Sequence, residues 1–347
     1  MLPFWFFYAI PVIGLLASRR FAPSARSAAW WLAGLLLTLA IGLRHQVGGD
    51  WFAYIGYLER ASSLTFQQIL LQGDPGYYLL NWLVAGLGGG IYSVNLACGA
   101  LLMSGILVFA RRQPLPWLAL LVSVPYLVIV VGMGYTRQAV ALGFVLLGLA
   151  ALADGRARRF AAWVLIGAAF HKSAVLLLPV AALAASEKRL WALVWMGAIT
   201  FIGGYLFLFD SADALWMNYV EADIQSEGGF VRVSMNAVPA LLFLVMRNRF
   251  SLDVHERRLW WWISVFALAC VPLVLLSSTA TDRVALYLIP LQIFVFSRLP
   301  LIAGDRIVRA YLVLSVSIYY AAVEAVWLLF ATHSVFWLPY QMYPFAL

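Results

Sequence analysis

The chain has 347 residues, of which 64% are hydrophobic and only 11% are charged, and its formal net charge is +8. A soluble domain carries about 25% charged residues, so this composition excludes an ordinary water-soluble enzyme or binding module. The basic balance does not indicate nucleic-acid binding, because the arginines lie in short clusters between apolar segments, a pattern typical of cytoplasmic loops. Apolar stretches of roughly 17 to 25 residues recur along the chain, and helices satisfy their own backbone hydrogen bonds in lipid.

We therefore predict an all-α, polytopic transmembrane protein with about 11 to 13 membrane segments, read as a single integral membrane domain over residues 1–347. The first segment is interpreted as a retained span, because the positive charges follow its apolar run instead of preceding it. In chain order the predicted segments are 3–17, 27–43, 76–110, 115–132, 137–153, 158–170, 172–185, 190–208, 233–246, 259–277, 283–298 and 310–330.

The arginine clusters set the expected topology of the loops. The predicted cytoplasmic loops are 19–26, 154–159, 186–189, 247–258 and 298–309. The predicted outer regions are the loops 44–75, 209–232 and 278–282 and the C-terminal tail.

Two segments leave the number of crossings open. Residues 76–110 contain "GLGGG" and are interpreted as two short helices, of which one is re-entrant or interfacial. Residues 158–185 are apolar on both sides of "FHKS", and two helices of about 14 residues are short for a hydrocarbon core of about 30 Å. A turn buried below the membrane surface is tolerated where it lines a cavity. We therefore expect His171 and Ser173 at the floor of an outward-facing cavity.

Four stretches carry polar or ionisable groups at positions that the bilayer penalises. A charge at mid-helix depth costs roughly 2.5–3.5 kcal/mol on insertion scales, so such groups usually have a function. On the predicted topology all four stretches face outside. Their polar residues are Arg44, His45, Asp50 and Tyr54; Arg137 and Gln138; His171 and Ser173; and Asp282, Arg283 and Tyr287.

Each stretch also has a structural interpretation that the sequence leaves open. Arg44 and Asp50 can form an interfacial ion pair, and Arg137 can extend its guanidinium to the interface from a helix end. His171 can be a polar contact between helices, and Asp282 with Arg283 a local cap and salt bridge. Glu324, alone in "YYAAVEAVWLLF", can pair with a buried arginine or take part in chemistry.

The four stretches together resemble a known family. "GLRHQVGGDWFAY" resembles the Arg…Gly-x-Asp-x-x-x-Tyr signature of the EpsG family, a branch of the Wzy-like polysaccharide polymerases. "GDPGYYLLNWL", "YTRQAVALGFVLLGLA", "AAFHKSAVLLLP", "DRVALYLIP" and "WLPYQMYP" are similar to the segments that follow in that family, in the same order. Where the family most often has Gly-Thr-Asp, this chain has Gly48-Gly49-Asp50, which removes a hydroxyl and keeps the carboxylate.

The resemblance implies a GT-C-like architecture and a glycosyltransferase that joins oligosaccharide repeat units carried on undecaprenyl diphosphate. It also implies a location in the bacterial inner membrane with the active site facing the periplasm. The expected product is a surface polysaccharide such as O-antigen, capsule or exopolysaccharide. Lipid-linked donor and acceptor and membrane lipids are the expected partners, a chain-length regulator is a candidate partner, and nucleic acid is not expected.

The residue types suit this reaction. Arginine binds phosphate oxygens in a bidentate manner, so Arg44, Arg137 and Arg283 are the candidate diphosphate ligands. A carboxylate or an imidazole can deprotonate the attacking sugar hydroxyl, so Asp50 and His171 are the candidate bases, and the sequence does not choose between them. The other expected substrate-binding residues are Tyr54, Gln138, Ser173 and Tyr287, with Trp51, Trp216 and Tyr219 as surfaces for sugar rings.

No cluster of carboxylates with metal-ligand spacing is evident, so we expect metal-independent transfer without a cofactor. Two other functions stay open at this point. A lipid-oligosaccharide flippase would show internal repeats and polar residues through the bilayer depth, and neither is evident. A transferase that moves a finished glycan to another acceptor, or an acyl group, would use the same arginine and histidine chemistry.

Overall fold

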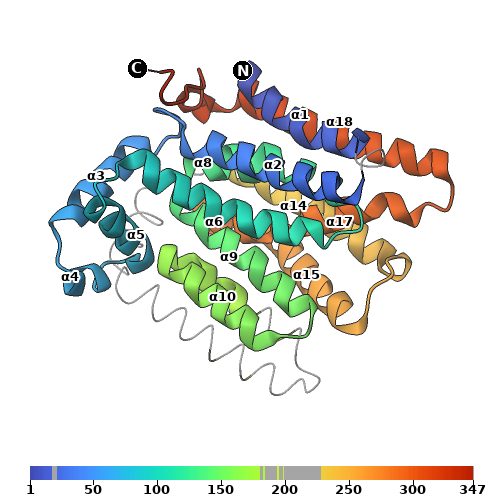
Figure 1. Cartoon of the computed structure of the whole chain (residues 1–347). Coiled ribbons are helices and arrows are strands. Elements are labelled where there is room, and N and C mark those ends of the chain that lie inside the picture. The colour runs from blue at the N-terminus through green and yellow to red at the C-terminus, as the bar shows by residue number, and fades with distance from the viewer. Residues whose placement is uncertain (18–21, 180–182, 184–193, 195–197, 199–227, 347) are drawn as a thin grey trace.

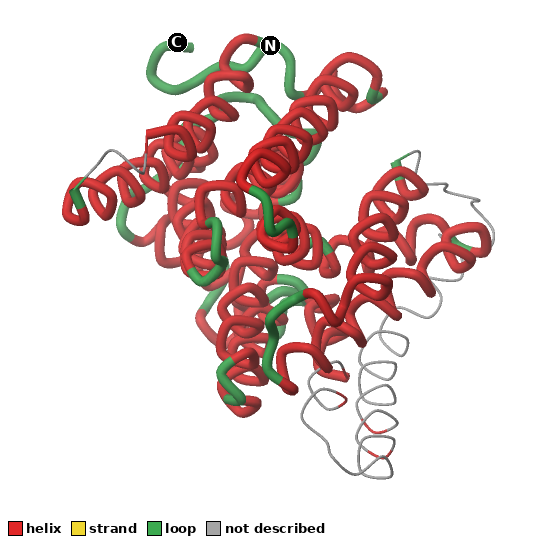
Figure 2. The backbone as a smooth tube through the Cα atoms, turned by 90° about the vertical axis from the view of Figure 1, so that its right-hand side faces the viewer, coloured by secondary structure: helices red, strands yellow, loops and turns green. Residues whose placement is uncertain are grey.

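The structure is a computed structural model of residues 1–347, which describes all of them except 18–21, 180–182, 184–193, 195–197, 199–227 and 347. The described residues form helices and no strands, as Figure 2 shows. Eight helical stretches among them are long and apolar enough to cross a membrane, which confirms the all-α, polytopic prediction. These stretches are α2 (Pro23–Gly42), α6 (Ile91–Arg111), Pro116–Gly134, α9 (Thr136–Ala153), Gly229–Arg249, α15 (Val254–Leu276), Thr281–Ile302 and α18 (Arg306–Phe330).

The segment 76–110 contains one helix, α6, that is long and apolar enough to cross a membrane. Helix α5 (Pro75–Gly86) ends before the predicted break and α6 begins after it. At about 1.5 Å per residue, the 12 residues of α5 are too short for a core of about 30 Å. Together with α3 (Trp51–Ser63) and α4 (Phe66–Leu70), α5 forms a lobe of short helices at the left of Figure 1.

The segment 158–185 is also broken where the sequence predicts. Helix α10 (Ala157–Phe170) ends before His171, whose backbone is extended, and a 3-10 helix, η2, runs over Lys172–Leu177. Most of the predicted segment 190–208, the predicted loop 186–189 and most of the predicted outer loop 209–232, with Trp216 and Tyr219, lie outside the described residues. The total of about 11 to 13 segments, the single domain and the GT-C-like architecture therefore stay predictions.

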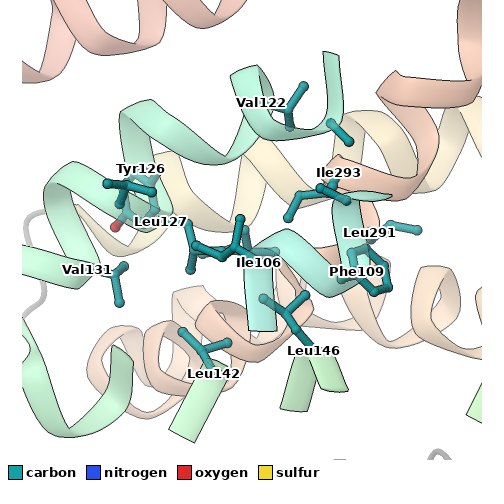
Figure 3. Packing of buried hydrophobic residues seen from close by; sticks show 14 of the residues in the cluster. Ile106, Phe109, Val122, Tyr126, Leu127, Val131, Leu142, Leu146, Leu291 and Ile293 are labelled. Atoms are coloured by element: carbon teal, nitrogen blue, oxygen red, sulfur yellow. The ribbon is translucent and has the colours of Figure 1, made fainter. Parts of the chain in front are cut away.

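The most buried of the eight stretches is Pro116–Gly134, which comprises α7 (Pro116–Ser123), a π-helix η1 (Val124–Val131) and α8 (Gly132–Gly134). It packs against α1 (Leu2–Ala17), α6, α18 and α17 (Pro290–Arg298). Figure 3 shows side chains of this stretch in one cluster with those of α6, α9 and α17. Pro125 has no N–H to donate, and a π-helical turn inside an α-helix often lies at a functional site.

Helices α6 and α9 approach each other through glycines. A Cβ on Gly105 would lie 2.1 Å from the carbonyl oxygen of Gly143, and a Cβ on Gly143 would lie 2.6 Å from the carbonyl oxygen of Leu101. Small residues allow such close contact of helix backbones, which is the main route to tight packing in a membrane. This contact holds α9, which carries Arg137, against the centre of the molecule.

The polar loops lie at the two opposite ends of the helix bundle. At one end Arg112 pairs with Asp154 at 2.6 Å, and Arg298 pairs with Glu256 at 2.8 Å. Asp154, Glu256 and Arg298 lie in loops predicted to be cytoplasmic. The opposite ends of α9 and α15 lead to Arg137 and to Ser277, at the end that carries the polar stretches of the sequence analysis.

The loop before α3 is fixed by the C-terminal segment that follows η6 (Thr332–Phe336). The amide of Gly48 donates to the carbonyl of Phe336 at 2.9 Å, that of His45 to Gln341 at 2.9 Å, and that of Tyr343 to Leu43 at 2.8 Å. Gly48 has a φ of +103°, and a Cβ there would lie 2.3 Å from the carbonyl oxygen of Met133. Only glycine is unstrained with this φ and this close contact. The turn of the backbone at Gly48 leads the chain into Asp50.

Candidate active site

A cavity of about 270 Å³ opens at the end of the bundle where the four polar stretches meet. It is lined by the start of α3, the start of α9, the turn between α10 and η2, α14 (Gly229–Met246) and α16 (Ser278–Leu288). Six of the nine predicted site residues line it. The lining residues are Asp50, Tyr54, Tyr135, Arg137, Gln138, His171, Arg232, Thr279, Asp282, Arg283 and Leu286.

Arg137 is held in place by two groups of the short-helix lobe. Its Nη1 lies 2.6 Å from Oδ2 of Asp74, the residue before α5. Its guanidinium carbon lies 4.7 Å from the centroid of the Tyr57 ring in α3, within the range of a cation–π contact. The Nε atom is buried without a hydrogen-bond partner in the described residues. Asp74 thus orients the guanidinium of Arg137, whose Nε–H remains available to donate a hydrogen bond.

Arg232, in α14, has a similar arrangement. It forms an ion pair with Asp282, and its guanidinium carbon lies 5.2 Å from the centroid of the Tyr126 ring. Tyr126 belongs to the π-helix η1, so this irregular turn places an aromatic ring under a cavity arginine. The Nε of Arg232 is buried and has no hydrogen-bond partner among the described residues. Asp282 therefore has a partner in Arg232 that the sequence analysis did not name, and its local pair with Arg283 stays a prediction.

Asp50 and Tyr54 lie on successive turns at the start of α3. Asp50 is open to the cavity on one side, and the protein around it removes enough water to raise the pKa of its carboxyl above the usual value. The positive charge of Arg137 and the Tyr54 hydroxyl oppose this rise in pKa. Of the two described carboxylates that line the cavity, Asp282 is committed to Arg232, whereas Asp50 forms no ion pair with a described residue.

His171 lies at the junction of α10 and η2, with its ring beside Ser173. The Nδ1 atom of His171 lies 2.9 Å from Oγ and 3.4 Å from the backbone nitrogen of Ser173. Burial and the positive charges of Arg137 and Arg283 lower the pKa of the imidazole to about 3. The ring is therefore neutral at physiological pH.

Three predicted site residues do not line the cavity. Ser173 and Tyr287 are each only 2% exposed, and their hydroxyl oxygens lie 3.0 Å apart, behind His171. The expectation that these two residues contact the substrate directly does not fit this position. They touch the site only through His171.

Arg44 is the third, and it is fully buried. Its guanidinium donates to the backbone carbonyls of Ile41 at 2.5 Å and Val47 at 3.2 Å, and to the side chains of Asn95 at 3.2 Å and Thr136 at 2.8 Å. The expectation that Arg44 lines the cavity, and the alternative of an ion pair with Asp50, are both corrected. The physical reason is that this arginine satisfies the carbonyls at the C-terminal end of α2 and ties them to α6 and α9.

Glu324 lies away from the cavity in the middle of α18. It is 1% exposed, and neither carboxyl oxygen has a hydrogen-bond partner in the part of the chain that the structure describes. The alternative that Glu324 pairs with a buried arginine does not hold within those residues.

Sequence reasoning missed Asp74, Tyr126 and Arg232. Asp74 stands in "GDPGYYLLNWL" directly before a proline, where it is readily interpreted as a helix-capping residue. Arg232 reads as the lone cation of an acidic loop, whereas it is the fourth residue of α14 and only 8% exposed. The available signal was an arginine directly before the predicted apolar segment 233–246.

The described residues contain no group of three or more His, Cys, Asp or Glu side chains that could hold a metal ion. Metal-independent transfer stays a prediction. The cavity instead combines three guanidinium groups with one unpaired carboxylate, a set suited to binding an anionic oxygen-rich substrate.

A family model described as the EpsG family matches residues 27–342. This chain belongs to the EpsG family. Comparison with curated proteins and with solved structures gives no match.

Membership in the EpsG family indicates a polysaccharide polymerase-like function and lipid-linked glycans as the class of substrate. In this EpsG protein, the match includes every described element that lines the cavity. Segments far apart in the sequence therefore converge on one site within the matched region.

Proposed function

We propose that this EpsG protein is a Wzy-type glycosyltransferase that polymerises oligosaccharide repeat units carried on a polyprenyl diphosphate at the periplasmic face of the bacterial inner membrane. The observation that carries the proposal is the cavity that Asp50 lines together with Arg137, Arg232 and Arg283. In the proposed reaction a sugar hydroxyl attacks the anomeric carbon of the donor. The bond to the diphosphate breaks, and polyprenyl diphosphate leaves with the electron pair.

The arginines suit the leaving group. Negative charge grows on the diphosphate as the bond breaks, and preoriented donors stabilise that charge in the transition state. Arg137 and Arg232 each keep an Nε–H beyond their carboxylate partner, so the ion pairs orient the two groups without using all their donors. A guanidinium has five N–H donors. The carboxylates also reduce the repulsion between the arginines before substrate arrives.

Asp50 suits the role of general base. It is the cavity carboxylate without an ion-pair partner in the described residues, and burial raises its pKa toward the range in which a carboxylate accepts a proton from a hydroxyl most effectively. The hydroxyl proton would pass to Asp50 as the new glycosidic bond forms. Tyr54 and Gln138 line the same cavity and are proposed to contact the sugars.

A deletion strain tests the function and supplies the substrate. Loss of the polysaccharide ladder, with single repeat units still transferred to the surface, is the result expected for a polymerase. Lipid-linked glycan extracted from that strain should then give chains of several repeats when it is incubated with purified protein in liposomes. Transfer of one unit to lipid A without elongation indicates a ligase, and movement across the bilayer without a new bond indicates a flippase; either result overturns the proposal.

The proposed orientation has a separate test with two cysteine variants. Ser63 ends α3 in the lobe near the cavity, whereas Ser251 lies between α14 and α15, and both are exposed. The native Cys98 and Cys270 are buried, so their background reaction should be low. In intact spheroplasts an impermeant maleimide should label the Ser63→Cys variant, and should label Ser251→Cys only after permeabilisation. The reverse pattern would put the cavity on the cytoplasmic face.

A further inference from the structure

His171 and Asp50 are both able to accept a proton in principle, but the surroundings of the histidine decide which of its ring nitrogens is available. The backbone N–H of Ser173 points at Nδ1 from 3.4 Å, and an N–H group only donates. Nδ1 is therefore an acceptor. A neutral imidazole carries one proton, and when Nδ1 accepts, that proton is on Nε2.

Two hydroxyls reinforce the same tautomer. Ser173 Oγ lies 2.9 Å from Nδ1, and the Tyr287 hydroxyl lies 3.0 Å from Ser173 Oγ. Either hydroxyl can donate or accept in their mutual contact. The Nε2–H tautomer requires that Tyr287 donates to Ser173, so that the Ser173 proton is directed to Nδ1. Ser173 and Tyr287 are each 2% exposed, so water does not compete for these bonds.

The charges around the ring also disfavour proton uptake. Arg137 from α9 and Arg283 from α16 both act on His171, and all three residues line the cavity. A protonated imidazole near two guanidinium groups would be repelled. An Nε2–H donor near them would instead add to their attraction for an anionic oxygen.

We propose that Ser173 and Tyr287 are positioning residues that hold His171 in its Nε2–H tautomer, so that His171 donates a hydrogen bond to a diphosphate oxygen and does not act as the base. The assignment rests on the proposed function, and it deepens that function by separating the roles of Asp50 and His171. It also gives Ser173 and Tyr287 a role that requires no contact with substrate.

NMR measures the tautomer of His171 directly, independently of any enzymatic activity. Protein with ¹⁵N-labelled histidine in liposomes should give an His171 signal, identified by its absence in His171→Gln, with a protonated Nε2 and an unprotonated Nδ1. Ser173→Ala keeps the backbone N–H and loses the shorter hydroxyl contact with Nδ1, so it should raise the share of the Nδ1–H tautomer without making it the main form. An His171 signal with a protonated Nδ1 overturns the assignment, whatever the protein turns out to catalyse.

Turnover tests the role of the ring. A glutamine amide reaches about as far as Nε2 and donates a hydrogen bond, but it cannot act as a base. His171→Gln should therefore stay within about 10-fold of wild type, whereas His171→Ala should lose about 10²- to 10³-fold in turnover, the usual effect of removing such a donor. Equal and complete loss in both variants would mean that His171 is the base. Absence of polymer from the wild-type protein would instead overturn the proposed function and leave the NMR result standing.

A double-mutant cycle separates positioning from general stability. Ser173→Ala should lower turnover about 5- to 10-fold, the effect of one buried neutral hydrogen bond. In the His171→Gln background the same change should have an effect below about 2-fold, because Ser173 acts only through the ring. Ser264→Ala is the matched control, since Ser264 is a fully buried hydroxyl that bonds its own helix at the Trp260 carbonyl. An undiminished effect of Ser173→Ala in the glutamine background contradicts the positioning role.

Discussion

Replacing Asp50 with asparagine should lower turnover by about 10²- to 10⁴-fold, the range by which a general base contributes to catalysis. Asparagine keeps the size and polarity of the side chain and loses its affinity for a proton. Binding of the lipid-linked glycan should persist, because the cavity arginines remain. The measurement is chain elongation in liposomes, together with retention of the labelled glycan by the variant.

The pH dependence of turnover is a second test of Asp50 as the general base. A base must be deprotonated, so the rate should fall as the pH falls through the pKa of Asp50. Burial raises that pKa, and the acid limb should therefore lie above the usual aspartate value of about 3.9. Asp154→Asn is the control, because Asp154 pairs with Arg112 and Arg156 at the opposite end of α9. Near-wild-type polymer from the Asp50→Asn variant would remove Asp50 from the mechanism.

Arg137→Lys should lower turnover by about 10²- to 10³-fold. Lysine keeps the positive charge and can keep the ion pair with Asp74, so the fold should be preserved. It lacks the Nε donor and the planar group that lies over the Tyr57 ring. A point charge does not reproduce the bidentate fork that recognises phosphate oxygens. The loss should appear in turnover with saturating lipid-linked glycan.

The chain offers a closely matched control for this variant. Arg112 also forms an ion pair with an aspartate at 2.6 Å, but at the end of the bundle away from the cavity. Exposed ion pairs contribute little to stability, so Arg112→Lys should leave turnover and expression close to wild type. If both lysine variants lose activity equally, the effect of Arg137→Lys belongs to folding and the diphosphate role is wrong.

Most of the fold could be predicted because bilayer thickness sets the length of each apolar run. The segments before Arg44, between Pro116 and Ala153 and after Arg306 differ from the predicted ones by only a few residues at each end. The breaks at "GLGGG" and "FHKS" were also predictable, since glycine and a polar cluster interrupt an apolar run. The π-helical turn at Val124–Val131 was not, because it depends on packing around Pro125 and leaves no periodic signal in an entirely apolar stretch.

The sequence predicted the site residues that are charged and stand in an apolar stretch. It did not predict the role of a charged residue when that role depends on its hydrogen-bond or ion-pair partners in the fold. Asp50, Arg137 and His171 stand out in the sequence, and the structure brings them to one cavity. Arg44 stands out equally, yet it is buried among backbone carbonyls, because the end of α2 and the loop after it need a donor there. Sequence spacing gives no sign of this difference, nor of the pairing of Arg232 with Asp282 across two helices.

The contact between the C-terminal segment and the loop before Asp50 also has a consequence for biosynthesis. The Tyr340 hydroxyl bonds the carbonyl of Ala40, which the ribosome added 300 residues earlier. At about 5 to 20 residues per second, the two segments are synthesised roughly 15 to 60 seconds apart. During that interval the loop that carries Asp50 is already in place but lacks the backbone bonds to Phe336, Gln341 and Tyr343. A nascent chain therefore contains Asp50, the proposed base, and Arg137 for much of its synthesis before the loop that carries Asp50 gains these bonds.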